Sequence, residues 1–212
     1  MEIRPVPQLG VLVSGRGSNL AAIAAAIDDG RLRAAVAVVV SNHAEAPALQ
    51  FARERGIPAR LVAREDYSTA AEFDDAVVEA LRAHSVKLVC LAGFMRRLGV
   101  RFCDAFPNAI LNIHPSLLPA FPGLDAQRQA LDHGVKVAGA TVHFVVPALD
   151  AGPIVAQESV PVVDGDTVES LSARILAVEH RLFPAAIGRV LAGGWHIDGR
   201  RVIFGGDSGS VG

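Results

Sequence analysis

Two polar residues, Asn112 and His114, stand at the end of a predicted strand over 109–114. Alternate residues of a strand point to the same face, so we expect the amide and the imidazole side by side. Such a pair can stabilise a developing oxyanion and carry a proton. Asp150, in a turn at 149–153, would favour the protonated form of His114 if the two side chains meet. Separately, these residues suit a structural histidine and a turn-forming aspartate; together they predict an acid–base site.

A second candidate site is the glycine-containing turn at 14–19 (SGRGSN), between a predicted strand and a predicted helix. Glycines allow the backbone to approach an anion, and the N–H groups at the start of a helix attract phosphate. The turn lacks the Lys-Ser/Thr ending of a Walker A loop and the third glycine of a dinucleotide-binding loop. We therefore predict a phosphate site rather than an NAD site, with a tight structural turn as the alternative.

The elements that would position these residues alternate along the chain. Short β-branched runs separate Ala-rich stretches of helical length, which is typical of an α/β fold with a doubly wound, mostly parallel sheet. Two longer strands, at 137–146 and 153–163, and a long C-terminal helix at 167–191, interrupted before Pro184, are expected to follow. The other predicted strands lie at 10–14, 36–41, 59–62, 88–91 and 109–114, and the other helices at 18–27 (capped by Ser18), 46–55 and 70–84.

Composition limits the class of protein. The 212 residues are 51% hydrophobic with a formal net charge of −2, which excludes a disordered chain and gives no basic excess for nucleic acid. We expect one domain over 1–212, with 1–9 and 205–212 flexible. The longest apolar runs are far below the roughly 20 residues of a membrane span, and no secretory signal is visible, so we expect a cytoplasmic protein. No residues have metal-ligand spacing, so no metal is expected. His143 is interpreted either as structural or as a support behind the site residues.

Several motifs together resemble one family, the phosphoribosylglycinamide formyltransferases. The resemblance covers about residues 10–203 and implies a Rossmann-like formyltransferase fold. It also implies transfer of a formyl group from 10-formyltetrahydrofolate to the amine of glycinamide ribonucleotide in purine biosynthesis, with small-molecule substrates and a monomer or homodimer. The motifs are VLVSGRGSNL (11–20), LAGFM (91–95), LNIHPSLLP (111–119), PG (122–123), TVHFV (141–145) and LDAGP (149–153).

The resemblance also implies residue roles. Asn112 and protonated His114 would stabilise the oxyanion of a tetrahedral intermediate, and Asp150 would keep His114 protonated and help to order a proton-carrying water. The ribonucleotide would be held by Gly17, Ser18, Asn19 and Glu179. The folate would be held by Met95, Arg96, Arg97, Leu98, Asn112, Val146, Pro147, Ala148, Leu149 and Asp150.

At three positions the chain departs from many members of that family. Arg97 replaces an aliphatic residue, Asp125 a histidine or asparagine, and Ala70 lies where an arginine usually meets the folate tail; Arg64 is a candidate replacement for that cation. Alternative functions are hydrolysis of the formyl folate, another formyl transfer such as that to methionyl-tRNA, or a non-catalytic nucleotide-binding α/β module. The extra domain that usually accompanies the first two is not expected here.

Overall fold

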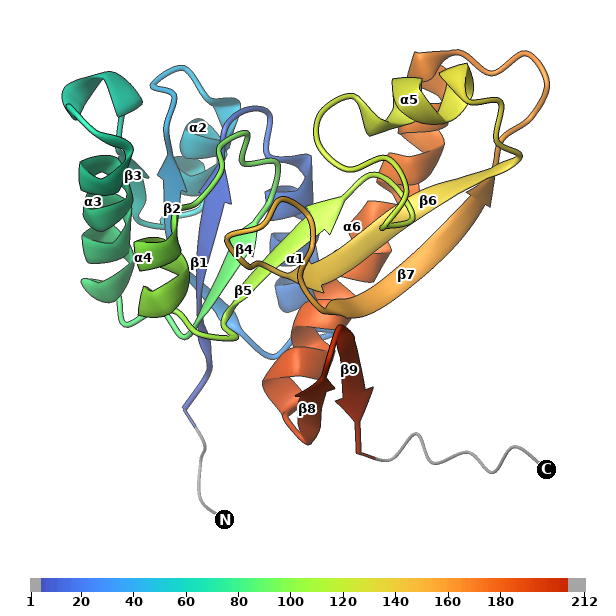
Figure 1. The fold of residues 1–212 in the computed structure, drawn as a ribbon. Helices are drawn as coiled ribbons and strands as arrows, with labels where there is room; N and C mark the ends of the chain where they lie inside the picture. The colour runs from blue at the N-terminus through green and yellow to red at the C-terminus, as the bar shows by residue number, and fades with distance from the viewer. Residues whose placement is uncertain (1–4, 206–212) are drawn as a thin grey trace.

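The computed structural model describes residues 5–205, which form a mixed sheet flanked by helices (Figure 1). The strands are β1 (Gln8–Val13), β2 (Ala35–Ser41), β3 (Ala59–Leu61), β4 (Leu88–Leu91), β5 (Ile110–His114), β6 (Val137–Phe144), β7 (Ile154–Pro161), β8 (Trp195–Asp198) and β9 (Arg201–Phe204). The α-helices are α1 (Ser18–Asp28), α2 (Pro47–Glu54), α3 (Ala70–Arg82), α4 (Val100–Ala105), α5 (Ala126–Asp132) and α6 (Val168–Ala192), and a 3₁₀ turn spans Arg64–Asp66.

The sheet has the order β3-β2-β1-β4-β5-β6-β7-β9-β8. Its first five strands are parallel, whereas β6 runs antiparallel to both of its neighbours, β5 and β7. Side chains of β4 are buried along its whole length, as expected for a strand covered on both faces. The strand order reverses between β1 and β4, and open α/β sheets bind ligands beyond the carboxyl ends of strands at such a point. The predicted doubly wound, mostly parallel sheet is confirmed.

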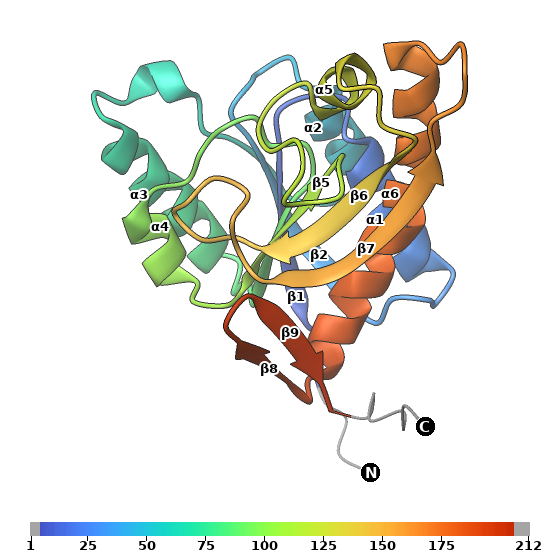
Figure 2. The same cartoon turned by 45° about the vertical axis from the view of Figure 1, so that its right-hand side comes forward.

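Two cores lie on opposite faces of the sheet. Leu20 of α1, Leu49 of α2 and Ile175 of α6 pack on one face. Phe73 of α3 and Phe102 of α4 pack on the other. Figure 2 shows α6 running along the sheet beside α1, with α3 and α4 on the far side of the strands. The long helix α6 therefore lies on the same face as the turn that follows β1.

Some predicted details are wrong. Ser18 does not cap α1; the cap is Gly17, in the left-handed conformation (φ 76°), and it makes no side-chain capping bond. Helix α6 is continuous through Pro184, which is buried within it. Gln8 and Leu9 belong to β1, so the predicted flexible segment 1–9 does not extend to them. Residues 1–4 and 206–212, which make up much of the two predicted flexible ends, lie outside the described residues.

Four elements escaped prediction: α4, α5, β8 and β9. Each is only 4–7 residues long, too short for a hydrophobic period to stand out. Two of them matter for the site, because α4 and α5 follow the loops that come after β4 and β5. Within residues 5–205, no helix is both long and apolar enough to cross a bilayer.

Candidate active site

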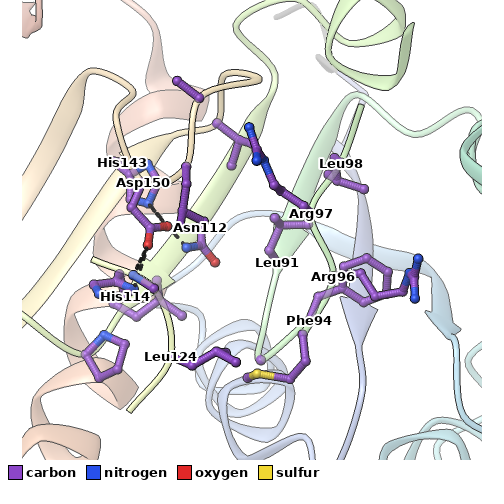
Figure 3. A pocket seen from close by; sticks show the side chains of 18 of the residues that line it. Leu91, Phe94, Arg96, Arg97, Leu98, Asn112, His114, Leu124, His143 and Asp150 are labelled. Atoms are coloured by element: carbon purple, nitrogen blue, oxygen red, sulfur yellow. Dashed lines mark hydrogen bonds and ion pairs between the residues drawn. The ribbon is translucent and has the colours of Figure 1, made fainter. Parts of the chain in front are cut away.

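A cavity of about 600 Å³ opens at the carboxyl ends of β4 and β5, within the size range of small-molecule sites. The loop at 93–98 forms one wall and the loop at 145–150 forms another. All ten residues that the family resemblance implies for folate binding line this cavity. Figure 3 shows Asn112, His114 and Asp150 on one side, across from Phe94, Arg96 and Arg97. The prediction that these segments meet in space is confirmed, whereas their role in binding stays a prediction.

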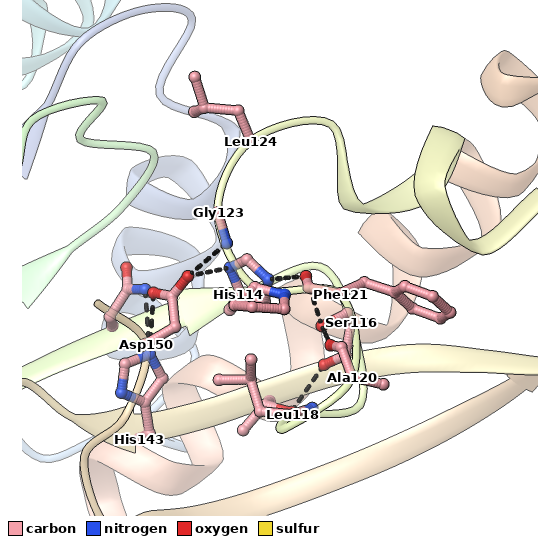
Figure 4. A network of polar contacts seen from close by, with 12 residues as sticks. His114, Ser116, Leu118, Ala120, Phe121, Gly123, Leu124, His143 and Asp150 are labelled. Carbon is pink, nitrogen blue, oxygen red and sulfur yellow. Dashed lines mark hydrogen bonds and ion pairs between the residues drawn. The ribbon is translucent and has the colours of Figure 1, made fainter. Parts of the chain in front are cut away.

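His114 has an oxygen acceptor at each ring nitrogen. Its Nε2 lies 2.9 Å from the Phe121 carbonyl oxygen, and its Nδ1 lies 3.5 Å from Oδ2 of Asp150 (Figure 4). A carbonyl can only accept, so Nε2 carries a hydrogen. The side chain is only 6% exposed, so the ring is held between its two acceptors and shielded from water.

Asp150 is held in place by its own turn. Its backbone adopts the left-handed conformation (φ 47°), and its Oδ2 accepts a 2.8 Å hydrogen bond from the Gly123 N–H. Gly152 keeps the turn close to β6, since a Cβ there would lie 1.7 Å from the Phe144 carbonyl oxygen. The carboxylate is thereby fixed between two histidines, His114 and His143.

His143 orients the amide of Asn112. Its side chain is 2% exposed, and burial lowers its pKa, so the neutral ring is favoured. Its Nδ1 faces the Phe144 carbonyl at 2.9 Å and donates to it, which leaves Nε2 as an acceptor for Asn112 Nδ2 at 3.2 Å. His143 also lines the cavity. The contact with Asn112 agrees with the second of the two interpretations of His143, a support for the site residues, although the sequence did not identify Asn112 as its partner. The register that pairs the two residues was a possible signal.

The loop after β5 is fixed by hydroxyl and amide contacts. Thr141 donates to the Ser116 carbonyl at 2.6 Å and accepts from the Leu118 N–H at 3.0 Å. Gln157 donates to the Leu118 carbonyl at 2.8 Å. Because β6 and β7 supply Thr141 and Gln157, the antiparallel strands hold the loop that presents the Phe121 carbonyl to His114.

The predicted phosphate turn is closely packed and has an open helix terminus. A Cβ at Gly17 would lie 2.6 Å from Cβ of Ala48, so only glycine fits there. Among the described residues, no side chain caps α1. Asn19 Nδ2 donates to Glu179 Oε2 at 2.7 Å, and burial raises the pKa of Glu179. Within the described part of the chain, Asn19 Oδ1 is buried without a hydrogen-bond partner. The predicted ribonucleotide residues thus lie together, with polar groups available to a ligand.

The three positions at which the chain departs from many members of the family lie in different environments. Arg97 Nη2 donates to the Pro147 carbonyl at 2.9 Å and joins the two walls of the cavity. Asp125 lines the cavity as the N-cap of α5, and Ala70 begins α3. Arg64 donates to the Tyr67 carbonyl and is not among the lining residues. The lining cations are Arg96, which stacks on Phe73, and Arg97.

No group of three or more His, Cys, Asp or Glu side chains in residues 5–205 is placed to hold a metal ion. Both cysteines, Cys90 and Cys103, are buried free thiols. The groups of the cavity that can carry a proton or hold a charge include His114, His143 and Asp150.

Comparison with known proteins identifies the class. The model of the family "Formyl transferase" matches residues 8–187, most of the chain, and the chain belongs to that family. More specifically, a phosphoribosylglycinamide formyltransferase of Bacillus subtilis is 41% identical over 184 residues, covering 87% of this chain and 94% of the relative. The crystal structure of glycinamide ribonucleotide transformylase 1 from Symbiobacterium toebii superposes with a TM-score of 0.92 at 54% identity, covering 94% of each chain. The resemblance to the phosphoribosylglycinamide formyltransferases is confirmed.

A further relative is much longer than this chain. The trifunctional purine biosynthetic protein adenosine-3 of Gallus gallus is 47% identical over 186 residues, which make up 88% of this chain but 18% of that protein. The chain therefore spans less than a fifth of that relative.

Proposed function

We propose that this chain transfers the formyl group of 10-formyltetrahydrofolate to the amine of glycinamide ribonucleotide, a step of purine biosynthesis. The single observation that carries the proposal is the convergence of Asn112, His114 and Asp150 in one cavity. The close similarity to a phosphoribosylglycinamide formyltransferase and a glycinamide ribonucleotide transformylase supports the choice of acceptor.

The donor would occupy the cavity beside the loops at 93–98 and 145–150. Apolar side chains such as Leu91, Phe94 and Val145 form walls suited to a flat ring system, and backbone groups of both loops can recognise its polar edge. The acceptor phosphate would lie at the open N-terminus of α1, where N–H groups and the helix dipole favour an anion. Glu179, beside Asn19, would accept hydrogen bonds from the ribose hydroxyls.

Formyl transfer breaks one C–N bond and forms another. The amine of the acceptor attacks the formyl carbon, and the C=O electron pair moves to oxygen to give a tetrahedral oxyanion. Asn112 Nδ2–H would donate to this oxygen. A protonated His114 would stabilise it through its positive charge, since its two ring nitrogens face the Phe121 carbonyl and Asp150. Donors aimed at developing charge are worth about 3–4 kcal/mol each in comparable enzymes. The C–N bond to the folate then breaks as the oxyanion collapses. One amine proton ends on the folate nitrogen, by way of a water that Asp150 helps to order.

The decisive assay mixes the purified protein with both substrates and follows formylated ribonucleotide and tetrahydrofolate together. His114→Ala should reduce kcat by at least about a hundredfold, in the range of lost acid–base catalysis. His196, on β8, is exposed, so His196→Ala serves as a matched control with activity close to that of the parent.

Three outcomes would contradict the proposal. No turnover of the ribonucleotide by the parent protein would reject the acceptor. Release of formate without formylated product would favour a hydrolase. Full activity of His114→Ala, with an unchanged thermal midpoint, would reject the role assigned to the imidazole.

A further inference from the structure

Ser14 stands where the two candidate substrate sites meet. The strand order reverses between β1 and β4; the phosphate turn at 14–19 follows β1, and the loop at 93–98 follows β4. The backbone N–H of Ser14 donates to the Gly93 carbonyl at 3.0 Å. This bond extends the contact between β1 and β4 beyond their last paired residues, Leu12 and Leu91.

The Ser14 hydroxyl adds two further bonds. It donates to Asn42 Oδ1 at 2.6 Å and accepts from the Met95 N–H at 2.8 Å. A hydroxyl has one hydrogen, so donation to Asn42 directs a lone pair of the oxygen toward Met95. Asn42 follows β2 and is only 5% exposed, so it is a fixed acceptor. A single side chain thus connects the segments that follow β1, β2 and β4.

The two segments that Ser14 joins, the loop at 93–98 and the turn at 14–19, each belong to a candidate binding site. Gly93 has φ 78°, a left-handed conformation that redirects the chain after β4. Met95 to Leu98 then line the cavity. On the other side, the Gly15 carbonyl accepts from the Ala48 N–H at 3.3 Å, which holds the turn against α2. The turn and the wall of the cavity are therefore linked through Ser14.

We propose that Ser14 is a positioning residue that couples the two substrate sites, so that an anion at the turn raises the affinity of the cavity for its ligand. An anion that holds the turn also holds the hydroxyl against Met95, so the second ligand meets a wall already in position. Coupling of binding is reciprocal, so a ligand in the cavity raises the affinity of the turn for the anion by the same factor. The inference rests on the proposed function for the identity of the two ligands.

The test measures binding without turnover. Tetrahydrofolate is titrated into the protein by calorimetry, with and without saturating ribose 5-phosphate. We expect the parent protein to bind tetrahydrofolate at least about fivefold more tightly with the sugar phosphate present, the lower end of measured couplings. Ser14→Ala should bring this ratio close to one, and Ser14→Thr, which keeps the hydroxyl, should retain most of it.

Ser41 provides a matched control. It is a fully buried serine at the end of the neighbouring strand β2, and its hydroxyl bonds the backbone of His43 within its own loop. Ser41→Ala should leave the coupling ratio unchanged. If Ser14→Ala does not fold, Asn42→Ala is the second test variant. It removes the acceptor that orients the Ser14 hydroxyl, so it should lower the coupling ratio.

Each other outcome overturns the inference. The role of Ser14 would be rejected if the parent shows no coupling or if Ser14→Ala leaves the coupling ratio unchanged. If Ser14→Ala does not fold, an unchanged ratio in a folded Asn42→Ala would reject it. If Ser41→Ala lowers the coupling ratio as much as Ser14→Ala does, the effect is not specific to the Ser14 hydroxyl. If the parent binds neither probe, the proposed function fails and the inference fails with it. If it binds both without coupling, only the inference fails.

Discussion

At the scale of single residues, the candidate site depends on two histidines that share one carboxylate. Asp150 lies 3.5 Å from His114 Nδ1 and 3.8 Å from His143 Nε2. Burial lowers the pKa of His143, and Asn112 donates to its Nε2. The neutral form of His143 is therefore favoured, and its ring accepts from the Asn112 amide. The two histidines thus differ in their contacts, since His114 lies between the Phe121 carbonyl and Asp150.

Glu179 gives a prediction about pH at this scale. Because burial raises its pKa, the folded protein binds this proton more tightly than the unfolded chain does. The contribution of Glu179 to the free energy of unfolding therefore falls as pH rises from its unfolded-state pKa through its raised folded-state pKa. Glu179→Gln removes this dependence and should raise the thermal midpoint at about pH 8 relative to the parent, with little gain at about pH 4.

The same substitution should weaken acceptor binding. Hydrogen bonds to charged groups are worth about 1.5–3 kcal/mol, so the KM for the ribonucleotide should rise at least about tenfold. Glu158 of β7 forms an ion pair with Arg181, so Glu158→Gln is a suitable control that also replaces a glutamate by glutamine. A lower midpoint at pH 8, or an unchanged KM, would contradict this account.

At the scale of elements, the turn between β6 and β7 determines where Asp150 points. Gly152 packs against the Phe144 carbonyl, the same group to which His143 donates. Gly152→Ala must displace the turn, and displacements of about 1 Å can reduce rates by on the order of a hundredfold. We expect kcat to fall by about that factor while the protein still folds.

Gly188 in α6 is the matched control for this change. A Cβ there would meet Leu32 Cδ1 at 3.5 Å, an ordinary contact, and alanine favours the helix. Gly188→Ala should therefore keep full activity and equal or higher stability. Steady-state kinetics together with thermal unfolding of the two variants separate displacement of the site from loss of the fold.

Elements were predictable from the sequence where local pattern determines them. The apolar runs of β1, β2 and β4 and the period of α3 predicted their positions to within a few residues. The predicted Ser18 cap is wrong because Ser18 is already the first residue of the helix, and Gly17, in its left-handed conformation, occupies the cap position. The hydroxyl contacts of Ser14 were not predicted because its partners lie 28 and 81 residues away, at Asn42 and Met95. Contacts of that kind become visible only when the strand order is known.

At the scale of the whole molecule, the cavity lies between two parts of the sheet. The parallel strands supply Asn112, His114 and the loop at 93–98, and the antiparallel pair β6 and β7 supplies the loop at 145–150. Neither part alone encloses the cavity. The predicted meeting of these loops followed from motif resemblance, whereas the direct bond between them did not, because it depends on the length and reach of one side chain, Arg97.

That bond gives the last prediction. Arg97 Nη2 donates to the Pro147 carbonyl at 2.9 Å and ties the two walls at an exposed position. A hydrogen bond of this kind contributes about 0.5–1.5 kcal/mol. Arg97→Ile should therefore raise the KM for the formyl-folate donor by about fivefold and leave kcat within about twofold, because the reacting groups are untouched. Arg101, whose ion pair with Asp75 lies outside the cavity, is the matched control as Arg101→Ala. A lower KM in Arg97→Ile would contradict this account. It would mean that the bond to Pro147 hinders entry of the donor into the cavity.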